Sequence, residues 1–195
     1  MHWLDRVDDQ TILEVHRVVS AVVEIGGAVG WLQTPTRAGI GQWLGGWHAA
    51  ATTGRAGLAL CRVGGRVDGQ IQALGGWGAE PEGALGHVVE LTKIMVHPDA
   101  RGRGLGRLVV DTLIDGADNF GAELLTLGVR GNNYGARALY KACGFETWGV
   151  LPNAAAVGDD RFDVVRMCRQ LRLPTNAVIH GSNAGGMGGS SLRPA

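Results

Sequence analysis

Residues 91–107, LTKIMVHPDARGRGLGR, are the stretch around which the rest of the chain is organised. An apolar run, 94–96, ends at His97 and Pro98, which is typical of a buried strand that runs into a turn. From Leu105 onward apolar residues recur at spacings of three and four, so an amphipathic helix is predicted there. The turn contains three glycines and three arginines: Gly102, Gly104, Gly106, Arg101, Arg103 and Arg107. Because glycines admit a ligand close to the backbone, and a helix N-terminus favours anions, the turn predicts a phosphate-binding site.

The order of the glycines distinguishes between the known phosphate-binding loops. No Gly-Lys-Ser/Thr follows them, which excludes a Walker loop, and their alternate spacing does not fit the dinucleotide fingerprint G-x-G-x-x-G. The pattern Arg-x-x-Gly-x-Gly after an apolar strand resembles motif A of the GNAT superfamily of N-acetyltransferases. In that family the loop amides hold the pyrophosphate of coenzyme A, so the resemblance implies acetyl-CoA as the acetyl donor. The alternative is an ordinary turn between a strand and a helix.

A second stretch, 133–145, reads NYGARALYKACGF and matches the family's second signature, N-x-x-A-x-x-L-Y-x-x-x-G-F. Asn133 is a suitable N-cap for a short helix, and Gly144 stands where a helix end favours a left-handed residue. Two motifs in this order extend the resemblance over most of the chain. We therefore expect a GNAT domain over 1–173 and, from its Gly, Ser, Asn and Pro content, a disordered tail over 174–195.

The resemblance implies an α/β (α+β) architecture, the GNAT fold, in which a mixed, twisted sheet of about seven strands has helices on both faces. In this fold the motif A strand and the strand after it diverge, and the pantetheine arm of coenzyme A enters the gap. Near the C-terminus the sequence predicts a strand over 145–150, a loop over 152–160 and a last strand over 161–169. Gly128 lies inside another predicted strand, where a glycine often marks a site at which a ligand comes close to the backbone. We attribute this approach to the cofactor.

The resemblance also implies which residues contact the cofactor. Backbone groups on the motif A strand are expected to bond the pantetheine amides, the loop amides to bind the pyrophosphate, and the motif B helix to line the thioester end. These residues are Met95, Val96, Arg101, Gly102, Arg103, Gly104, Leu105, Gly106, Arg107, Asn133 and Ala136.

Acetyl transfer to an amine requires a base for the ammonium and an acid for the departing thiolate. Glu90 lies on the motif A strand where many family members carry a catalytic glutamate, and a buried carboxylate with a raised pKa suits the base. Tyr140 matches the motif B tyrosine, whose hydroxyl lies beside the coenzyme sulfur and acts as the acid. The alternatives are a solvated Glu90 that faces Lys93 or an arginine, and a Tyr140 that only packs in the core.

Three tryptophans, Trp31, Trp43 and Trp47, are candidates to wall an acceptor pocket or to pack in the core. Within the family, the segments at 26–31, 90–107 and 149–152 resemble tabtoxin-resistance-type small-molecule acetyltransferases, which favours a small polar amine, including an amino-acid-like toxin or antibiotic. Two alternatives stay open. One is an N-terminal protein or peptide acetyltransferase, and the other is a non-catalytic coenzyme A-binding sensor or subunit.

Composition narrows the expected partners. The chain has 195 residues, a net charge of +0 and a pI of about 7.0, and it lacks an apolar run of membrane-spanning length, so neither nucleic acid nor a membrane is expected. The chain has three cysteines, an odd number without close spacing, so we expect them to be reduced and the protein to be cytoplasmic. No spacing of histidines or cysteines predicts a metal site. Because GNAT domains often associate through sheet edges, a homodimer is a further expectation.

Overall fold

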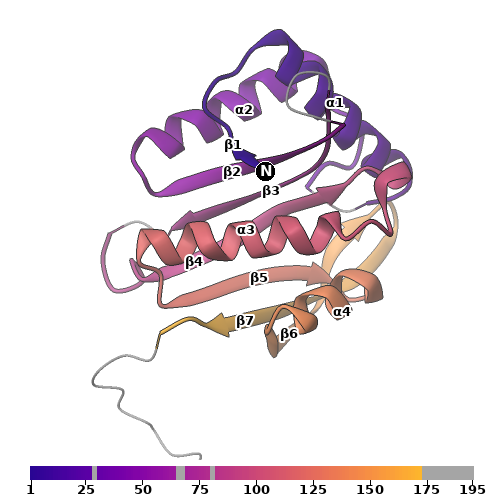
Figure 1. The fold of residues 1–195 in the computed structure, drawn as a ribbon. Helices are drawn as coiled ribbons and strands as arrows, with labels where there is room; N and C mark the ends of the chain where they lie inside the picture. The colour runs from indigo at the N-terminus through magenta and orange to yellow at the C-terminus, as the bar shows by residue number, and fades with distance from the viewer. Residues whose placement is uncertain (28–29, 65–68, 80–81, 173–195) are drawn as a thin grey trace, which may run out of the picture.

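The computed structural model describes residues 1–27, 30–64, 69–79 and 82–172 (Figure 1). The elements, in order, are β1 (His2–Trp3), α1 (Asp9–Glu24), α2 (Arg37–Thr52), β2 (Ala56–Val63), β3 (Gln70–Ala79), β4 (Val88–Val96), the 3₁₀ turn η1 (Pro98–Ala100), α3 (Leu105–Phe120), β5 (Leu124–Arg130), α4 (Tyr134–Ala142), β6 (Glu146–Val157) and β7 (Asp160–Gln170). The expected tail, 174–195, lies outside the described residues.

The seven strands form one mixed sheet in the order β1-β2-β3-β4-β5-β7-β6. Only the β4–β5 pair is parallel, and the other neighbours run antiparallel. Helices α1 and α2 cover one face over the first strands, and α3 and α4 cover the other face (Figure 1). The predicted fold is therefore confirmed.

Side-chain caps explain where three of the helices begin. The carboxylate of Asp8 accepts a hydrogen bond from the N–H of Thr11 at 2.8 Å, and the hydroxyl of Thr36 accepts one from Gly39 at 3.1 Å. Asn133 caps α4 by accepting from the N–H of Ala136 at 3.1 Å. None of the helices found among the described residues meets the length and apolarity that crossing a membrane requires.

The middle of the sheet opens where β4 leaves β5. The two strands pair only from Val88 to Glu90, opposite Leu124 to Thr126. Beyond that point β4 contains a bulge against β3, because Leu74 and Gly76 oppose Met95 and Thr92. Lys93, in the bulge, has a φ of 56°, a left-handed conformation that side chains other than glycine seldom adopt. The expected divergence of these two strands is confirmed.

The C-terminal hairpin differs from the expected arrangement. Residues 152–157, predicted as part of a loop, continue β6, and only a tight turn separates that strand from β7. Pro152 and Asn153 made this segment look like a loop. In the structure they fall where the β6–β7 register shifts, and Asn153 has a φ of 54°. Because β6 is an edge strand, the missing N–H of a proline does not interrupt the sheet.

Candidate active site

The glycine-rich turn and the first turn of α3 line a cavity of about 510 Å³, here called the anion cleft. Gly102 and Gly104 both have a φ of 75°, and a Cβ built on either one meets no atom within 4 Å. No side chain caps the helix at Gly104, so the first N–H groups of α3 are available to a ligand. The cleft therefore has the geometry of an anion site at a helix N-terminus.

Six of the seven residues predicted in this loop line the anion cleft: Arg101, Gly102, Gly104, Leu105, Gly106 and Arg107. Arg103 is an exposed residue of the turn and is not part of the lining. The guanidinium of Arg107 is already engaged, because its Nε lies 2.8 Å from Asp111 and its Nη1 donates to the carbonyl of Ala142 at 3.0 Å.

The anion cleft leads to a second cavity of about 230 Å³ between the diverging strands, here called the strand gap. Four residues line both cavities: Ile94, Asn133, Ala136 and Tyr140. Val96 lines the cleft as predicted, whereas the Met95 side chain is buried under α1 and α2 on the opposite face. The two motifs thus meet at one continuous passage through the sheet.

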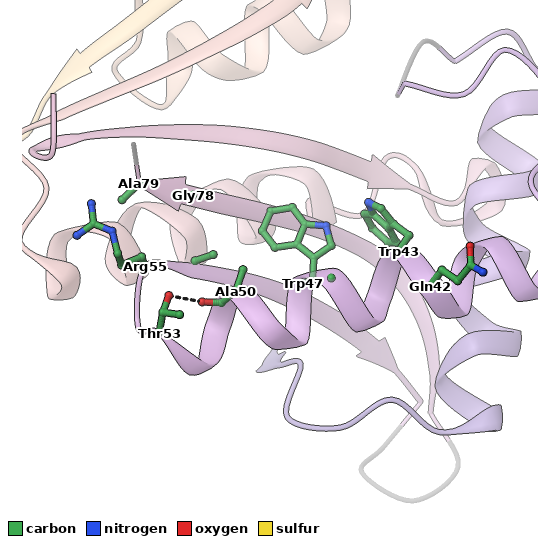
Figure 2. A pocket seen from close by; sticks show the side chains of 10 residues that line it. Gln42, Trp43, Trp47, Ala50, Thr53, Arg55, Gly78 and Ala79 are labelled. Atoms are coloured by element: carbon green, nitrogen blue, oxygen red, sulfur yellow. Dashed lines mark hydrogen bonds between the residues drawn. The ribbon is translucent and has the colours of Figure 1, made fainter. Parts of the chain in front are cut away.

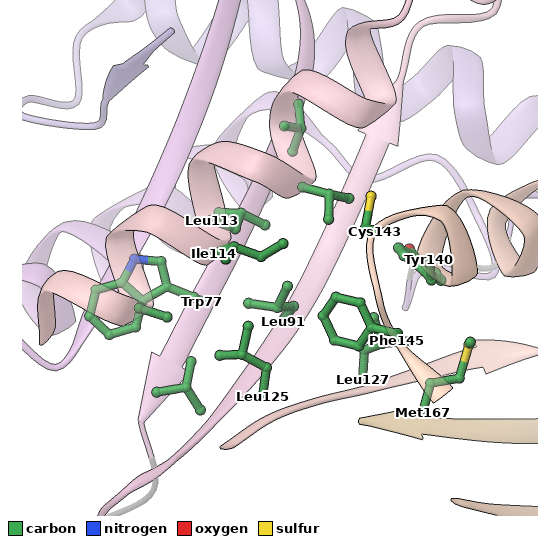
Figure 3. Close-up of a cluster of buried hydrophobic side chains, with 14 of the residues drawn as sticks. Trp77, Leu91, Leu113, Ile114, Leu125, Leu127, Tyr140, Cys143, Phe145 and Met167 are labelled. Carbon is green, nitrogen blue, oxygen red and sulfur yellow. The ribbon is translucent and has the colours of Figure 1, made fainter. Parts of the chain in front are cut away.

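Tyr140 stands where the two cavities meet. Its side chain is 8% exposed and packs against the ring of Phe145 at 6.2 Å, at the edge of the core cluster in Figure 3. Burial raises the pKa of Tyr140 to about 12, with a smaller contribution from Cys143. The hydroxyl is therefore a proton donor at any physiological pH.

Glu90 lines a third cavity of about 240 Å³, here called the carboxylate cavity, which adjoins the strand gap through Thr92 and Gly128. The expected burial is not found, because the Glu90 side chain is 46% exposed and lies 3.5 Å from the Nη1 of Arg166. The arginine comes from β7, two strands away in the sheet.

Gly128 explains how Arg166 reaches Glu90. A Cβ at position 128 would lie 3.0 Å from the Nη1 of Arg166, so the guanidinium crosses β5 where a side chain is missing. We attributed this glycine to a close approach of the cofactor. Its near neighbour in the structure is Arg166, and Gly128 also lines the strand gap, so the approach of the cofactor stays a prediction.

Lys93, which the sequence singled out only as a possible neighbour of Glu90, also lines the strand gap. Its Nζ lies 5.0 Å from the centroid of the Trp31 ring. Burial lowers the pKa of Lys93, and the nearby Glu90 opposes that shift. Neither the left-handed backbone of Lys93 nor the distant Arg166 leaves a signal in the sequence.

The three tryptophans form a single row on the same face of the sheet. The Trp31 and Trp43 rings are 5.2 Å apart and the Trp43 and Trp47 rings 6.2 Å apart, both edge to face. Trp43 and Trp47 border a cavity of about 600 Å³ along α2, here called the tryptophan trough (Figure 2). In the part of the chain that the structure describes, no group of three or more metal-ligating side chains is found.

Comparisons with known proteins match the chain to one family. The model described as the acetyltransferase (GNAT) family matches residues 29–145. The [ribosomal protein bS18]-alanine N-acetyltransferase of Escherichia coli K12 is 38% identical over 83 residues, which are 43% of this chain and 56% of that protein. The L-amino acid N-acyltransferase MnaT of the same organism is 32% identical over 85 residues, 44% of this chain and 49% of that protein. The chain thus spans about half the length of these curated relatives.

Solved structures share the fold at low sequence identity. The ribosomal-protein-alanine N-acetyltransferase of Brucella melitensis superimposes with a TM-score of 0.71 at 22% identity, covering 85% of this chain and 98% of that one. The acetyltransferase yncA of Salmonella typhimurium, determined with acetyl-CoA, gives a TM-score of 0.71 at 20% identity, covering 88% and 95%.

Proposed function

Because the chain belongs to the acetyltransferase (GNAT) family, we propose that it transfers an acetyl group from acetyl-CoA to a primary amine. One observation carries this proposal: the anion cleft joins the strand gap at Tyr140, and Glu90 lies on the other side of that gap. A donor that enters from α3 and an acceptor that enters from the opposite face would meet between β4 and β5.

The anion cleft fits the pyrophosphate of coenzyme A. Its open glycines and the uncapped N-terminus of α3 offer N–H groups to an anion, and the passage toward Tyr140 suits a narrow pantetheine arm. Val96, Asn133 and Ala136 would line that arm. Acetyl-CoA supplies the activated acetyl group as a thioester.

Glu90 would act as the general base. Although its carboxylate is half exposed, an ionised carboxylate beside a cavity can accept a proton from an ammonium directly or through water. Arg166 then orients Glu90 within the carboxylate cavity.

Tyr140 would protonate the departing sulfur as the carbon–sulfur bond breaks and the carbon–nitrogen bond forms. A phenol with a pKa of about 12 is a weak acid, yet the burial that raises its pKa also destabilises a thiolate at the same place. The pKa values of donor and acceptor therefore move in the same direction, and the transfer remains feasible.

We propose a small polar molecule as the acceptor, which includes an amino-acid-like toxin or antibiotic. The carboxylate cavity and the strand gap are both small, and Lys93 and Arg166 add polar contacts beside Glu90. Trp31, Trp43 and Trp47 would wall the acceptor side. The name of the MnaT relative, an L-amino acid N-acyltransferase, supports this class.

A peptide N-terminus is the second candidate, favoured by the name of the bS18-alanine N-acetyltransferase relative. A non-catalytic coenzyme A-binding role is the third. The presence of both Glu90 and Tyr140 beside the passage argues against it.

We also propose that the protein acts in the cytoplasm, where its three free cysteines would stay reduced, and that it forms a homodimer. The edge strand β6 carries exposed apolar side chains at Trp148, Val150 and Leu151, which would suit an association of sheet edges. Sedimentation of the purified protein tests the dimer directly.

Isothermal titration with acetyl-CoA, followed by a thiol-release assay on small amines and short peptides, tests the proposed function. We expect binding together with turnover on small amines. Turnover restricted to peptides would favour the second candidate, and binding without any turnover would favour the third. If acetyl-CoA does not bind, the proposal is wrong.

A further inference from the structure

The tryptophan trough, bordered by Trp43 and Trp47 of the proposed acceptor wall, lies outside the cavities that Tyr140 and Glu90 line. It lies between the flank of α2 and the adjoining ends of β2 and β3 (Figure 2). Apolar side chains, among them Trp43, Trp47 and Ala50, make up much of its wall. The charge at one end is Arg55, whose guanidinium already lies 5.4 Å from the ring centroid of Phe120. A cavity of about 600 Å³ with this lining suits an apolar group.

Two glycines of β3 shape the trough: Gly76 makes room for the Trp47 ring of its wall, and Gly78 lines the open space. The Trp47 ring rests directly on Gly76, where an added Cβ would come within 2.4 Å of it. At Gly78 an added Cβ would meet nothing within 4 Å, so the space above it is open. The alternation of a strand places both glycines on the face that α2 covers.

The two glycines are direct neighbours of candidate active-site residues across the β3–β4 ladder. Gly76 is paired with Thr92 and Gly78 with Glu90 in the antiparallel β3–β4 ladder. Directly opposed residues project from the same face of a sheet and lie about 5 Å apart. Glu90 and Thr92 both line the carboxylate cavity. The tryptophan trough and the carboxylate cavity are therefore one strand apart on one face.

We propose that the trough binds the side arm of the acceptor, and that the acceptor is a primary amine carrying an aromatic or similarly large apolar group. The inference rests on the proposed acetyl transfer to a primary amine. Among small-molecule acceptors it selects those with a polar end that carries the amine and an apolar group at the other end. The ammonium group lies at the Glu90 carboxylate, which is complementary to it in charge. The apolar arm crosses β3 above Gly78 and stacks on Trp43 and Trp47.

The test compares ethylamine with phenethylamine, two primary amines that differ by one phenyl group, in the acetyl-CoA-dependent thiol-release assay. Filling an apolar subsite changes kcat/KM by about 10- to 100-fold, so we expect phenethylamine to be preferred by that factor. Two variants test whether the trough causes this preference for phenethylamine. Gly46 lines the trough, whereas Gly45, its neighbour on α2, does not, and a Cβ at either position meets no atom within 4 Å.

We expect Gly46→Leu to lower kcat/KM for phenethylamine about tenfold or more and to leave ethylamine unchanged. Gly45→Leu, the matched control, should change neither value. Equal kcat/KM for the two amines, or a parallel loss of both in Gly46→Leu, would overturn the inference while leaving the proposed function intact. Absence of turnover with ethylamine and every other amine would overturn the proposed function itself, and the inference with it.

Discussion

The family motif assigns Tyr140 to the reaction, and its surroundings add a physical reason for its proposed role as the acid. The structure buries the hydroxyl between two cavities, where it keeps its proton up to about pH 12. Tyr140→Phe removes only the oxygen and preserves the ring packing on Phe145. We expect the acetylation rate to fall about 10²-fold or more, with acetyl-CoA affinity nearly unchanged in titration. Tyr134→Phe, the same change at an exposed position of α4, is the control. An equal loss of affinity and rate would contradict the acid role.

The sequence places Glu90 on the motif A strand, where the structure has it. The burial expected for its carboxylate is not found. Its place on β4 follows from the motif, but its neighbour Arg166 comes from β7 through the gap at Gly128, a non-local arrangement that a sequence pattern does not record. Without a base, the amine must lose its proton unaided. We therefore expect Glu90→Gln to move the pH profile of kcat/KM to higher pH and to reduce activity near pH 7 by about 10²-fold or more. Glu146→Gln, on the exposed edge strand β6, should keep the original profile; an unmoved profile in Glu90→Gln would remove it as the base.

At the scale of elements, prediction worked where the signals are local. Side-chain caps and glycines in left-handed conformations determine the ends of α1, α2, α3 and α4, and all of these signals can be read from the sequence. The same reasoning failed on β6, because Pro152 and Asn153 are typical of a loop, and only the position of the strand at the sheet edge makes them acceptable. The bulge at Lys93 was not predicted either, because it depends on how β4 pairs with β3 and not on a local sequence signal.

Helix α3 allows its structural and binding roles to be separated. Gly104 at its N-terminus has a φ of 75° and Gly121 at its C-terminus a φ of 99°. An alanine at either position is strained and should destabilise the protein by about 1 kcal/mol. Only Gly104 lines the anion cleft, so Gly104→Ala should also weaken acetyl-CoA binding, by about tenfold, whereas Gly121→Ala should not. Thermal melts and titrations of both variants measure the two effects. Equal affinities in the two variants would argue against the cleft as the pyrophosphate site.

At the scale of the whole molecule, the two layers of helices make the passage possible. Each layer has its own apolar cluster, and the sheet between them opens where β4 leaves β5. The family resemblance was sufficient to predict this opening. The row of tryptophans and the trough beside it were not predictable in detail, because they depend on the missing side chains of Gly76 and Gly78.

A buried carboxylate links α1 to the sheet, beside the apolar cluster that packs between them. Glu14 on α1 is 6% exposed, pairs with Arg62 of β2 at 2.5 Å, and accepts a hydrogen bond from the N–H of Ile71 on β3 at 3.1 Å. Burial by itself raises the pKa of Glu14, but the hydrogen bonds from Arg62, Gln10 and Ile71 outweigh it and hold the pKa below its ordinary value of 4.5. A carboxylate with a lowered pKa stabilises the fold fully above about pH 4.5, and this contribution is lost as the pH falls through the folded-state pKa.

Glu14→Gln should therefore lower the free energy of unfolding at pH 7 by about 1–3 kcal/mol, because Arg62 and Ile71 lose a charged acceptor. The deficit should shrink as the pH is lowered below 4.5, since the wild-type carboxylate becomes protonated and loses the same advantage. Urea unfolding at a series of pH values between 7 and 3 measures the difference. Glu24→Gln, at the exposed end of the same helix, should differ little from the wild type throughout. A deficit in Glu14→Gln that stays constant down to pH 3 would mean that the role of Glu14 in holding α1 on the sheet does not depend on its charge.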